Sequence, residues 1–457
     1  MTQPTLGHID SHDLSVFTDR YELSMMQGYI ESDHTPTATF SMYFRRLPPD
    51  RGYAIAAGLE QVIEYVETLE FGDQTIDFLA EEGFRDDFLS FLESFEFTGA
   101  IRALPEGSLV FPNEPMLEVT APIHEAQLFE TLILNQIGYQ TLVATKGARM
   151  VDVIRRQGDG QDLVDFGSRR AHGTDAGLKA ARAAYIGGFD GTSNVLAGNR
   201  FGVPTYGTMA HSWVQSFDSE RESFEAFADC YGDDAIYLVD TYDTIGGAER
   251  AVSVTEERDV SLGGVRLDSG DLIDLSNEVN EIVGDAGIVV SSGVDEYFLV
   301  EFFEEGGVAS AFGPGTAVTT SKDAPDSGVV YKLTAVERDG VLSPSMKLSP
   351  GKVTYPGRKE IHRVERDGSY QYDVLARHDE SLEGAGEPCL ETIFEDGSIV
   401  YTPPDLESIQ ERARRELEAL PERYRRIRNP DTYEVRISNE LETTTVETER
   451  STRDREM

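Results

Sequence analysis

Residues 146–320 repeat one pattern, and this repeat constrains the possible folds more than any other feature of the chain. A short apolar run ends in a polar or glycine-containing tip, a helical segment follows, and the next tip comes after about twenty to thirty residues, the spacing that a strand, a loop and a helix need. Seven such units in series favour a closed or nearly closed α/β barrel, whose active site lies where the strands end. The tips begin at Asp165, Phe189, Thr208, Asp240, Asp268, Ser291 and Phe312.

The segments on both sides of the repeat have a different pattern. Apolar residues at helical spacing from Leu59 to Leu69 predict a helix, and Ser108–Thr120 is β-like with prolines at its turns. We predict an N-terminal α+β domain at 1–145 that is completed by 335–402, a barrel at 146–334, and a helical, acidic C-terminal extension at 403–457. The polar stretch that starts at Thr443 is predicted to be a loose tail.

The charge balance excludes several classes of partner. The chain carries 83 acidic and 40 basic residues, a net charge of -43, and only seven of the basic residues are lysines. Such a surface repels nucleic acid and anionic lipid, so no nucleic-acid or membrane partner is expected. The composition is typical of a halophilic, cytoplasmic protein, because salt near 1 M shortens the Debye length to about 3 Å and screens the repulsion. A cluster of arginines is therefore informative here.

The sequence also limits compartment and cysteine chemistry. No apolar run reaches the roughly 18 residues of a membrane span, and the segment Met1–His8 lacks the basic start and apolar run of a signal peptide. Cys230 and Cys389 are too few for a disulfide framework or a four-cysteine zinc site. We expect both to be buried small hydrophobic residues in a reducing cytoplasm.

Two kinds of tip are suited to phosphate. Arg169 and Arg170 follow the first tip, and guanidinium groups suit phosphate or carboxylate, although two surface ion pairs would explain them equally well. The Asp165-Phe-Gly sequence is not a kinase motif, since no glycine-rich loop or His-Arg-Asp segment accompanies it. Late glycine tips of barrels often bind phosphate through backbone N–H groups. The glycine tips here contain Gly293, Gly313, Gly315 and Thr316.

Other tips carry a histidine and carboxylates. His211 is a candidate base or phosphate-accepting nucleophile, although a lone histidine is more often structural. Asp240 and Asp268 need a counter-charge from arginine or hydrated Mg²⁺, whereas Asp243 also fits a helix N-cap. The residues by themselves therefore indicate a barrel enzyme for a phosphorylated, Mg²⁺-chelated anionic substrate.

Five segments together resemble one family, the nicotinate phosphoribosyltransferases, in that family's order and over nearly the whole chain. The resemblance implies the type II phosphoribosyltransferase fold, an irregular α/β barrel of about seven strands with a β-rich α+β domain built from both chain ends. It also implies a homodimer with shared active sites. The reaction it implies joins nicotinate to 5-phosphoribosyl 1-diphosphate, with ATP as a co-substrate that is hydrolysed. The segments are Phe17–Tyr29, Asp165–Gly173, Tyr206–Trp213, Leu238–Thr244 and Arg266–Asp271.

The resemblance also implies roles for single residues. His211 would be the transiently phosphorylated histidine, and Asp240 and Asp268 would hold Mg²⁺. His211, Asp268 and Arg266 form the implied catalytic set. Phosphates would be held by Arg169, Gly293, Gly313, Gly315 and Thr316.

For the pyridine ring, the resemblance points to Phe166 on one face and the partner subunit's Tyr21 on the other. Arg266 is expected to bind the nicotinate carboxylate, with Thr208 nearby. Related nicotinamide enzymes carry an aspartate in a Gly-Thr-Asp-Thr segment, where this chain has Ser193. A serine can donate to a carboxylate that an aspartate would repel, so nicotinate is favoured.

Four alternatives remain. A nicotinamide phosphoribosyltransferase is disfavoured by Ser193, and the quinolinate enzyme needs a more basic pocket than these tips provide. A Schiff-base barrel lyase would use Lys146 or Lys332, although neither lies clearly at a strand tip. A binding protein without activity is disfavoured by the complete set of candidate groups.

Some archaeal relatives carry a cysteine-rich zinc knuckle, but only Cys389 lies in that region, so no structural zinc is predicted.

Overall fold

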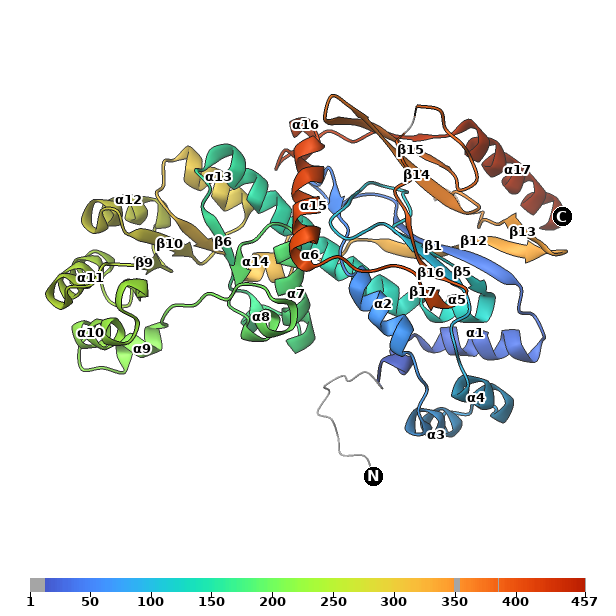
Figure 1. Cartoon of the computed structure of the whole chain (residues 1–457), viewed down its shortest axis with the longest axis horizontal. Coiled ribbons are helices and arrows are strands. Elements are labelled where there is room, and N and C mark those ends of the chain that lie inside the picture. Colours follow the sequence, from blue (N-terminus) through green and yellow to red (C-terminus); the bar gives the residue numbers. More distant parts are fainter. Residues whose placement is uncertain (1–12, 349–353, 385, 457) are drawn as a thin grey trace. The chain divides into compact units, whose positions relative to one another are not determined.

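The computed structural model describes residues 13–348, 354–384 and 386–456, which form two compact units (Figure 1). One unit comprises residues 1–141 and 326–457, and the other comprises 142–325. The boundaries expected at 145 and 334 therefore fall at 141 and 325, and the segment 403–457 is part of the first unit rather than an extension of its own. The N-terminal segment assessed for a signal peptide lies outside the described residues.

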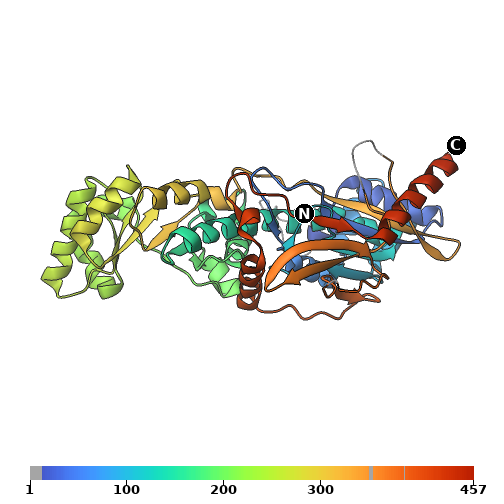
Figure 2. The same ribbon diagram turned by 90° about the horizontal axis from the view of Figure 1, so that it is seen from above.

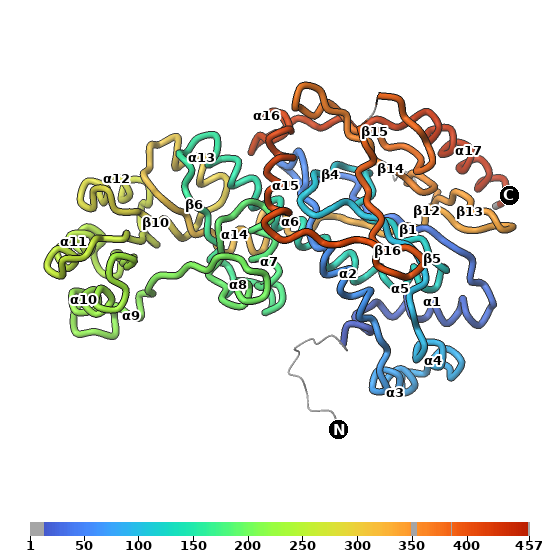
Figure 3. Tube along the Cα trace, viewed as in Figure 1, coloured from blue at the N-terminus to red at the C-terminus, as the bar shows by residue number. Residues whose placement is uncertain are grey.

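An antiparallel sheet built from both ends of the chain forms the frame of the first unit. Strand β16 from the C-terminal part pairs with β3, and β12 pairs with β1, which Figure 3 shows as orange segments among blue and cyan ones. The predicted β-rich domain from both chain ends is thereby confirmed. The sheet order is β13 (Val341–Pro344), β12 (Val329–Arg338), β1 (Thr37–Phe44), β5 (Leu117–Pro122), β3 (Ala100–Ala103), β16 (Glu391–Glu395) and β17 (Ser398–Ile399).

Helices cover this sheet with their apolar sides. The predicted helix near Leu59 is α2 (Leu59–Thr68), whose buried residues share one core with the strands. The long helix α6 (Glu130–Gln157) contributes Ile133 to the same core and continues into the second unit. The other helical segments of this part are η1 (Asp13–Val16), α1 (Arg20–Glu31), α3 (Asp73–Glu81), α4 (Asp86–Glu93) and α5 (Ile123–Leu128).

The C-terminal part adds smaller sheets and helices. The stretch predicted to be a loose tail is instead helix α17 (Asn439–Glu456), because Leu441 and Thr448 are buried and acidic first-turn and basic last-turn residues match the helix dipole. The remaining elements are β2 (Ala54–Ile55), β4 (Leu109–Val110), β14 (Lys359–Arg366), β15 (Ser369–Arg377), β18 (Val435–Ile437), α15 (Leu406–Ala419) and α16 (Glu422–Arg425).

The second unit contains a parallel sheet of six strands. Its order is β7 (Gly191–Thr192), β6 (Asp162–Asp165), β11 (Ala311–Gly313), β10 (Gly287–Ser291), β9 (Gly264–Leu267) and β8 (Ile236–Leu238). A seventh strand expected before Thr208 is reduced to one bridge between Thr192 and Thr205, because Pro204 has no N–H with which to lengthen the ladder. Within the described residues the ladder is open between Thr205 and β8.

Helices follow the strands as the repeat predicts. Helices α10, α11 and α12 lie side by side, and α11 and α12 contact the sheet (Figure 1). The segments are η2 (Ser168–Arg170), α7 (Thr174–Ile186), α8 (Val195–Phe201), α9 (His211–Gln215), α10 (Glu220–Tyr231), η3 (Gly232–Asp234), α11 (Thr244–Arg258), α12 (Leu272–Val283), α13 (Glu296–Glu304) and α14 (Thr316–Thr319). No helix among the described residues is long and apolar enough to cross a membrane.

The cysteines differ from the expectation that both are buried. Cys230 is exposed near the end of α10, because that helix buries Phe224 and Ala228 on its other side. Cys389 is partly buried, and its burial raises the pKa of the thiol to about 12. Both cysteines are free thiols.

A buried ion cluster ties α6 to α13 in the second unit. Glu296 is fully buried and pairs with Lys146 at 2.5 Å and with Arg149 at 3.0 Å. We expect Glu296→Gln to lower the free energy of unfolding by about 3–5 kcal/mol, because it leaves two buried cations short of one counter-charge. Denaturant unfolding measures this, and Glu301→Gln at an exposed position of α13 is the control. Equal stability of both variants would contradict the assignment.

Candidate functional site

A cavity of about 310 Å³ lies where strands of the parallel sheet end, and we call it the strand-edge cavity. Eight of the predicted site residues line it: Phe166, Arg169, Arg266, Asp268, Gly293, Gly313, Gly315 and Thr316. Three more charged residues line it: Arg170, which was considered together with Arg169, and Lys322 and Asp295, which were not predicted. The lining therefore carries four basic and two acidic side chains, the reverse of the balance of the whole chain.

Arg266 is the hub of the cavity. It extends from β9, and its Nε donates to Ser291 Oγ at 2.8 Å. One terminal nitrogen pairs with Asp268 Oδ1 at 2.7 Å, and the other lies 3.3 Å from Thr208 Oγ1. Its guanidinium carbon is 5.3 Å from the centre of the Phe166 ring. The predicted carboxylate-binding arginine is thus held beside the predicted ring-binding phenylalanine.

Asp268 follows β9 directly and is held as a carboxylate. Burial acts to raise the pKa of Asp268, but donation from Ser291 Oγ at 2.6 Å and the charge of Arg266 outweigh it and lower the pKa. The Asp268 backbone N–H donates to Asp240 Oδ2 at 3.0 Å, and Ser269 Oγ donates to the same oxygen at 2.5 Å. The two predicted metal-binding carboxylates are therefore linked neighbours.

His211 lies at the start of α9, close to this pair. Its Nδ1 is 3.1 Å from Thr241 Oγ1, and its Nε2 is 3.9 Å from Asp268 Oδ2. The ring is about two-fifths exposed. The histidine therefore presents Nε2 near the carboxylate while Thr241 holds its other nitrogen.

The glycine tips serve two geometric needs. A Cβ on Gly313 would lie 2.4 Å from the Phe166 ring, so glycine makes room for that ring. Gly293 has a φ of +70°, which favours glycine over other residues. These glycines therefore bring backbone close to the cavity and to Phe166.

Asp165 organises the loop behind Phe166 and was not predicted as a site residue. It is buried at the end of β6, where it accepts from the Gly167 N–H and the Thr192 hydroxyl, both at 2.8 Å. Burial raises the pKa of Asp165 even though these donors act to lower it. Ser291 and Lys322 were also missed, although Ser291 begins a tip and Lys322 is one of the rare lysines.

Several predicted residues lie outside the cavity lining. Thr208 reaches it only through Arg266. Ser193 is exposed after β7, and its N–H donates to Asp165 O at 2.8 Å. Tyr21 belongs to the first unit, where it is 46% exposed, and burial followed by the charge of Glu130 raises its pKa.

The lysines proposed for Schiff-base chemistry are placed differently from what that chemistry needs. Lys146 is buried and paired with Glu296 and Asp323, and Lys332 is in the first unit near Glu130. Neither lines the strand-edge cavity. A Schiff base needs an amine that can lose its proton next to the substrate, so the structure gives this alternative no support.

Comparison with known proteins covers most of the chain. The nicotinate phosphoribosyltransferase N-terminal domain matches residues 16–138, the nicotinate phosphoribosyltransferase family matches 161–349, and the C-terminal domain of the same name matches 383–445. The nicotinate phosphoribosyltransferase pncB2 of Mycobacterium tuberculosis is 42% identical over 443 residues, which are 95% of this chain and 93% of that protein.

Two further relatives agree. The nicotinate phosphoribosyltransferase of Bacillus subtilis is 38% identical over 462 residues, covering 93% of each chain. The crystal structure of human nicotinic acid phosphoribosyltransferase matches with a TM-score of 0.83 at 29% identity, covering 94% of this chain and 99% of that chain. This likeness confirms the predicted fold class.

Proposed function

The chain belongs to the nicotinate phosphoribosyltransferase family, and from this premise we propose how its residues carry out the reaction. The enzyme transfers the 5-phosphoribosyl group from 5-phosphoribosyl 1-diphosphate to nicotinate, giving nicotinate mononucleotide and diphosphate for NAD salvage. The observation that best supports the proposal is the strand-edge cavity, where Arg266, Phe166 and Asp268 lie among glycine tips.

Nicotinate is bound by an arginine and an aromatic ring in this proposal. A pyridine ring against Phe166 would bring its carboxylate to Arg266, whose fork suits two carboxylate oxygens. The partner subunit's Tyr21 would cover the other face of the ring. The exposed fraction of Tyr21, 46%, supports this shared site and the homodimer that it needs.

The phosphoribosyl donor is bound by the rest of the lining. Departure of diphosphate leaves positive charge on the ribose carbon and places negative charge on the leaving group. Arg169, Lys322 and the backbone N–H groups near Gly293 and Gly315 would bind the phosphates. The ionised carboxylate of Asp268 would stabilise the developing positive charge on the sugar.

The two linked aspartates fit a hydrated Mg²⁺ ion. Asp240 Oδ1 is buried and has no hydrogen-bond partner among the described residues, and an unsatisfied carboxylate oxygen is costly unless a cation meets it. Two protein carboxylates are enough for Mg²⁺, because water and substrate phosphate complete its coordination. Asp240 and Asp268 would hold the ion, which would neutralise charge on the diphosphate.

ATP coupling is assigned to His211. A phosphoryl group on Nε2 would lie near Asp268, while Thr241 fixes Nδ1.

We also propose a cytoplasmic location, supported by the exposed free thiol of Cys230, which persists in a reducing compartment.

Ser193 is the residue that we expect to separate nicotinate from nicotinamide as substrates. Ser193→Asp should raise KM for nicotinate by about tenfold, because it adds a negative charge after β7, next to the backbone of Asp165. Initial rates with the sugar diphosphate, Mg²⁺ and either base, with and without ATP, measure this and test the whole proposal. Asn199→Asp, which adds the same charge at an exposed position of α8, is the control. Unchanged nicotinate kinetics in Ser193→Asp would show that Ser193 is not part of the site. If the wild-type protein uses nicotinamide but not nicotinate, the chain is instead a nicotinamide phosphoribosyltransferase.

A further inference from the structure

The first unit contains a second cavity with a basic lining, which we call the arginine cavity. It has a volume of about 650 Å³ and lies between the ends of β12 and β15, the segment before β14, and α17. Its charged residues are four arginines, Arg338, Arg358, Arg377 and Arg455, and two acids, Asp379 and Glu447. The strand-edge cavity has the same balance of four basic and two acidic residues. In a chain with 83 acidic and 40 basic residues, this balance is unexpected.

Three of these four arginines form no direct ion pair with a carboxylate of the described residues. Arg377 pairs with Asp379 at 2.6 Å. Among the described residues, no carboxylate pairs with Arg338, Arg358 or Arg455. The Arg358 Nε is buried without any hydrogen-bond partner there.

Burial and like charge act against the charged form of two of these arginines. Burial and the charge of Arg455 lower the pKa of Arg338. Burial lowers the pKa of Arg358 too, and the charge of Arg102 contributes, whereas the carboxylates of Glu118, Asp379 and Glu360 oppose the shift without pairing directly with Arg358. Guanidinium groups that are partly buried and close to like charge are stabilised when an anion joins them.

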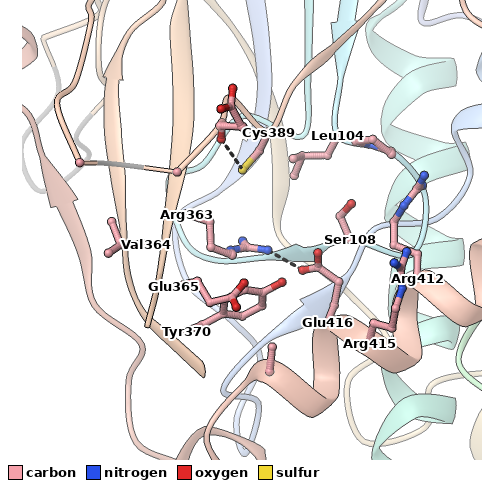
Figure 4. A pocket seen from close by; sticks show the side chains of 15 residues that line it. Leu104, Ser108, Arg363, Val364, Glu365, Tyr370, Cys389, Arg412, Arg415 and Glu416 are labelled. Atoms are coloured by element: carbon pink, nitrogen blue, oxygen red, sulfur yellow. Dashed lines mark hydrogen bonds and ion pairs between the residues drawn. The ribbon is translucent and has the colours of Figure 1, made fainter. Parts of the chain in front are cut away.

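A third cavity shows what a cavity with balanced charge looks like. The cavity beside Cys389, about 750 Å³ in volume, is lined by three arginines and three glutamates (Figure 4). Its Arg363 points to Glu416 and pairs with it at 2.6 Å, and it also pairs with Asp373 at 2.8 Å. The charge of that arginine is used within the protein, so that cavity gives no reason to expect an anion.

We propose that the arginine cavity binds a small, multiply charged phosphate-bearing anion at a site formed by Arg338, Arg358 and Arg455. The volume is that of a small-ligand site. Among the described residues, His378 is the one lining side chain with an aromatic ring and no Phe, Tyr or Trp lines the cavity, so we expect recognition to depend mainly on the phosphate group. The site also gives a role to α17, the red helix that runs to the labelled C-terminus in Figure 2, because Thr444, Thr448 and Ser451 supply hydroxyls to one wall.

Calorimetric titration of the full-length protein with inorganic diphosphate tests this site. We expect two equivalents per chain, one in each basic cavity. Arg358→Gln and Arg455→Gln should each weaken diphosphate binding in the arginine cavity by roughly tenfold or more, since each removes a charged hydrogen-bond donor. Arg169→Gln should weaken diphosphate binding in the strand-edge cavity. Arg453→Gln is the control, because it is two residues away on α17 and pairs with Glu449 in the helix.

A second measurement separates binding from folding. Without phosphate, Arg338→Gln should keep or raise the melting temperature, because it removes a partly buried charge that Arg455 also repels. Diphosphate should raise the melting temperature of the Arg169→Gln protein, and this increase should be lost when Arg358→Gln is added. If Arg338 has a structural role instead, Arg338→Gln should lower the melting temperature.

The outcomes distinguish the possible results. Wild-type diphosphate binding in both Arg358→Gln and Arg455→Gln would overturn the proposal, and so would binding of chloride but not phosphate. If Arg358→Gln and Arg455→Gln each lose one diphosphate equivalent but Arg169→Gln still binds two, the proposed function of the strand-edge cavity fails while the site in the arginine cavity stands. Titration with ADP identifies the source of the phosphate group, since tighter binding of ADP indicates a nucleotide and tighter binding of diphosphate an inorganic ligand.

Discussion

Asp268→Asn is expected to lower kcat/KM for nicotinate mononucleotide synthesis by about a thousandfold. The change keeps the shape of the side chain but removes the negative charge that pairs with Arg266 and accepts from Ser291. Arg266 would lose a partner that fixes its position beside Phe166. The developing positive charge on the ribose would lose its nearby carboxylate.

Steady-state kinetics with both substrates varied measures the effect. Asp274→Asn, at an exposed position of α12, is the matched control and should keep activity within about twofold of wild type, as for most surface substitutions. If Asp268→Asn retains more than a tenth of wild-type turnover, the carboxylate is not part of the chemistry.

The acid limb of the pH profile checks the same residue. The pKa of Asp268 is lowered from its ordinary value of 3.8, so the group stays ionised throughout the range from pH 7 to 5. Stability from its pairing is present above pH 3.8 and is lost as the pH falls through the lowered folded-state pKa. Loss of activity near pH 6 would therefore have to come from another group.

The repeat of strand, tip and helix was enough to predict the parallel sheet and the edge at which its strands end. Parallel strands bring their C-terminal ends together whatever the details of the helices, so tips far apart in sequence share one cavity. The strand before Thr208 was overestimated, because a local apolar pattern does not show that Pro204 limits the ladder.

Contacts that depend on packing were beyond the sequence. The helical pattern of α17 has few apolar residues, so its order comes from Leu441 and Thr448 being buried against the rest of the first unit. Asp165 was read only as part of a tip, since nothing local shows that Thr192 donates to it from the next strand. The three unpaired arginines of the arginine cavity lie on three separate segments, and their convergence appears only in three dimensions.

His211→Ala is expected to abolish the stimulation of nicotinate mononucleotide synthesis by ATP, and with it nucleotide hydrolysis. The His211 imidazole lies near the linked aspartates and can carry a phosphoryl group, whereas alanine offers no atom to accept one. When ATP is absent, the variant should transfer the phosphoribosyl group at about the rate of the wild-type protein, because Arg266, Phe166 and Asp268 line the cavity and His211 does not. The two activities should therefore separate in this variant.

The measurement is the ratio of initial rates with and without ATP, together with phosphate released per nicotinate mononucleotide formed. A label transferred from γ-phosphate-labelled ATP to the wild-type protein, stable in alkali and absent in His211→Ala, would identify phosphohistidine directly. His172→Ala is the control, since His172 is exposed in the same unit and lies outside the cavity lining. Because Thr241 holds Nδ1 and leaves Nε2 toward Asp268, Thr241→Val should weaken the ATP effect without removing the acceptor. Full ATP stimulation in His211→Ala would show that the coupling uses a different residue.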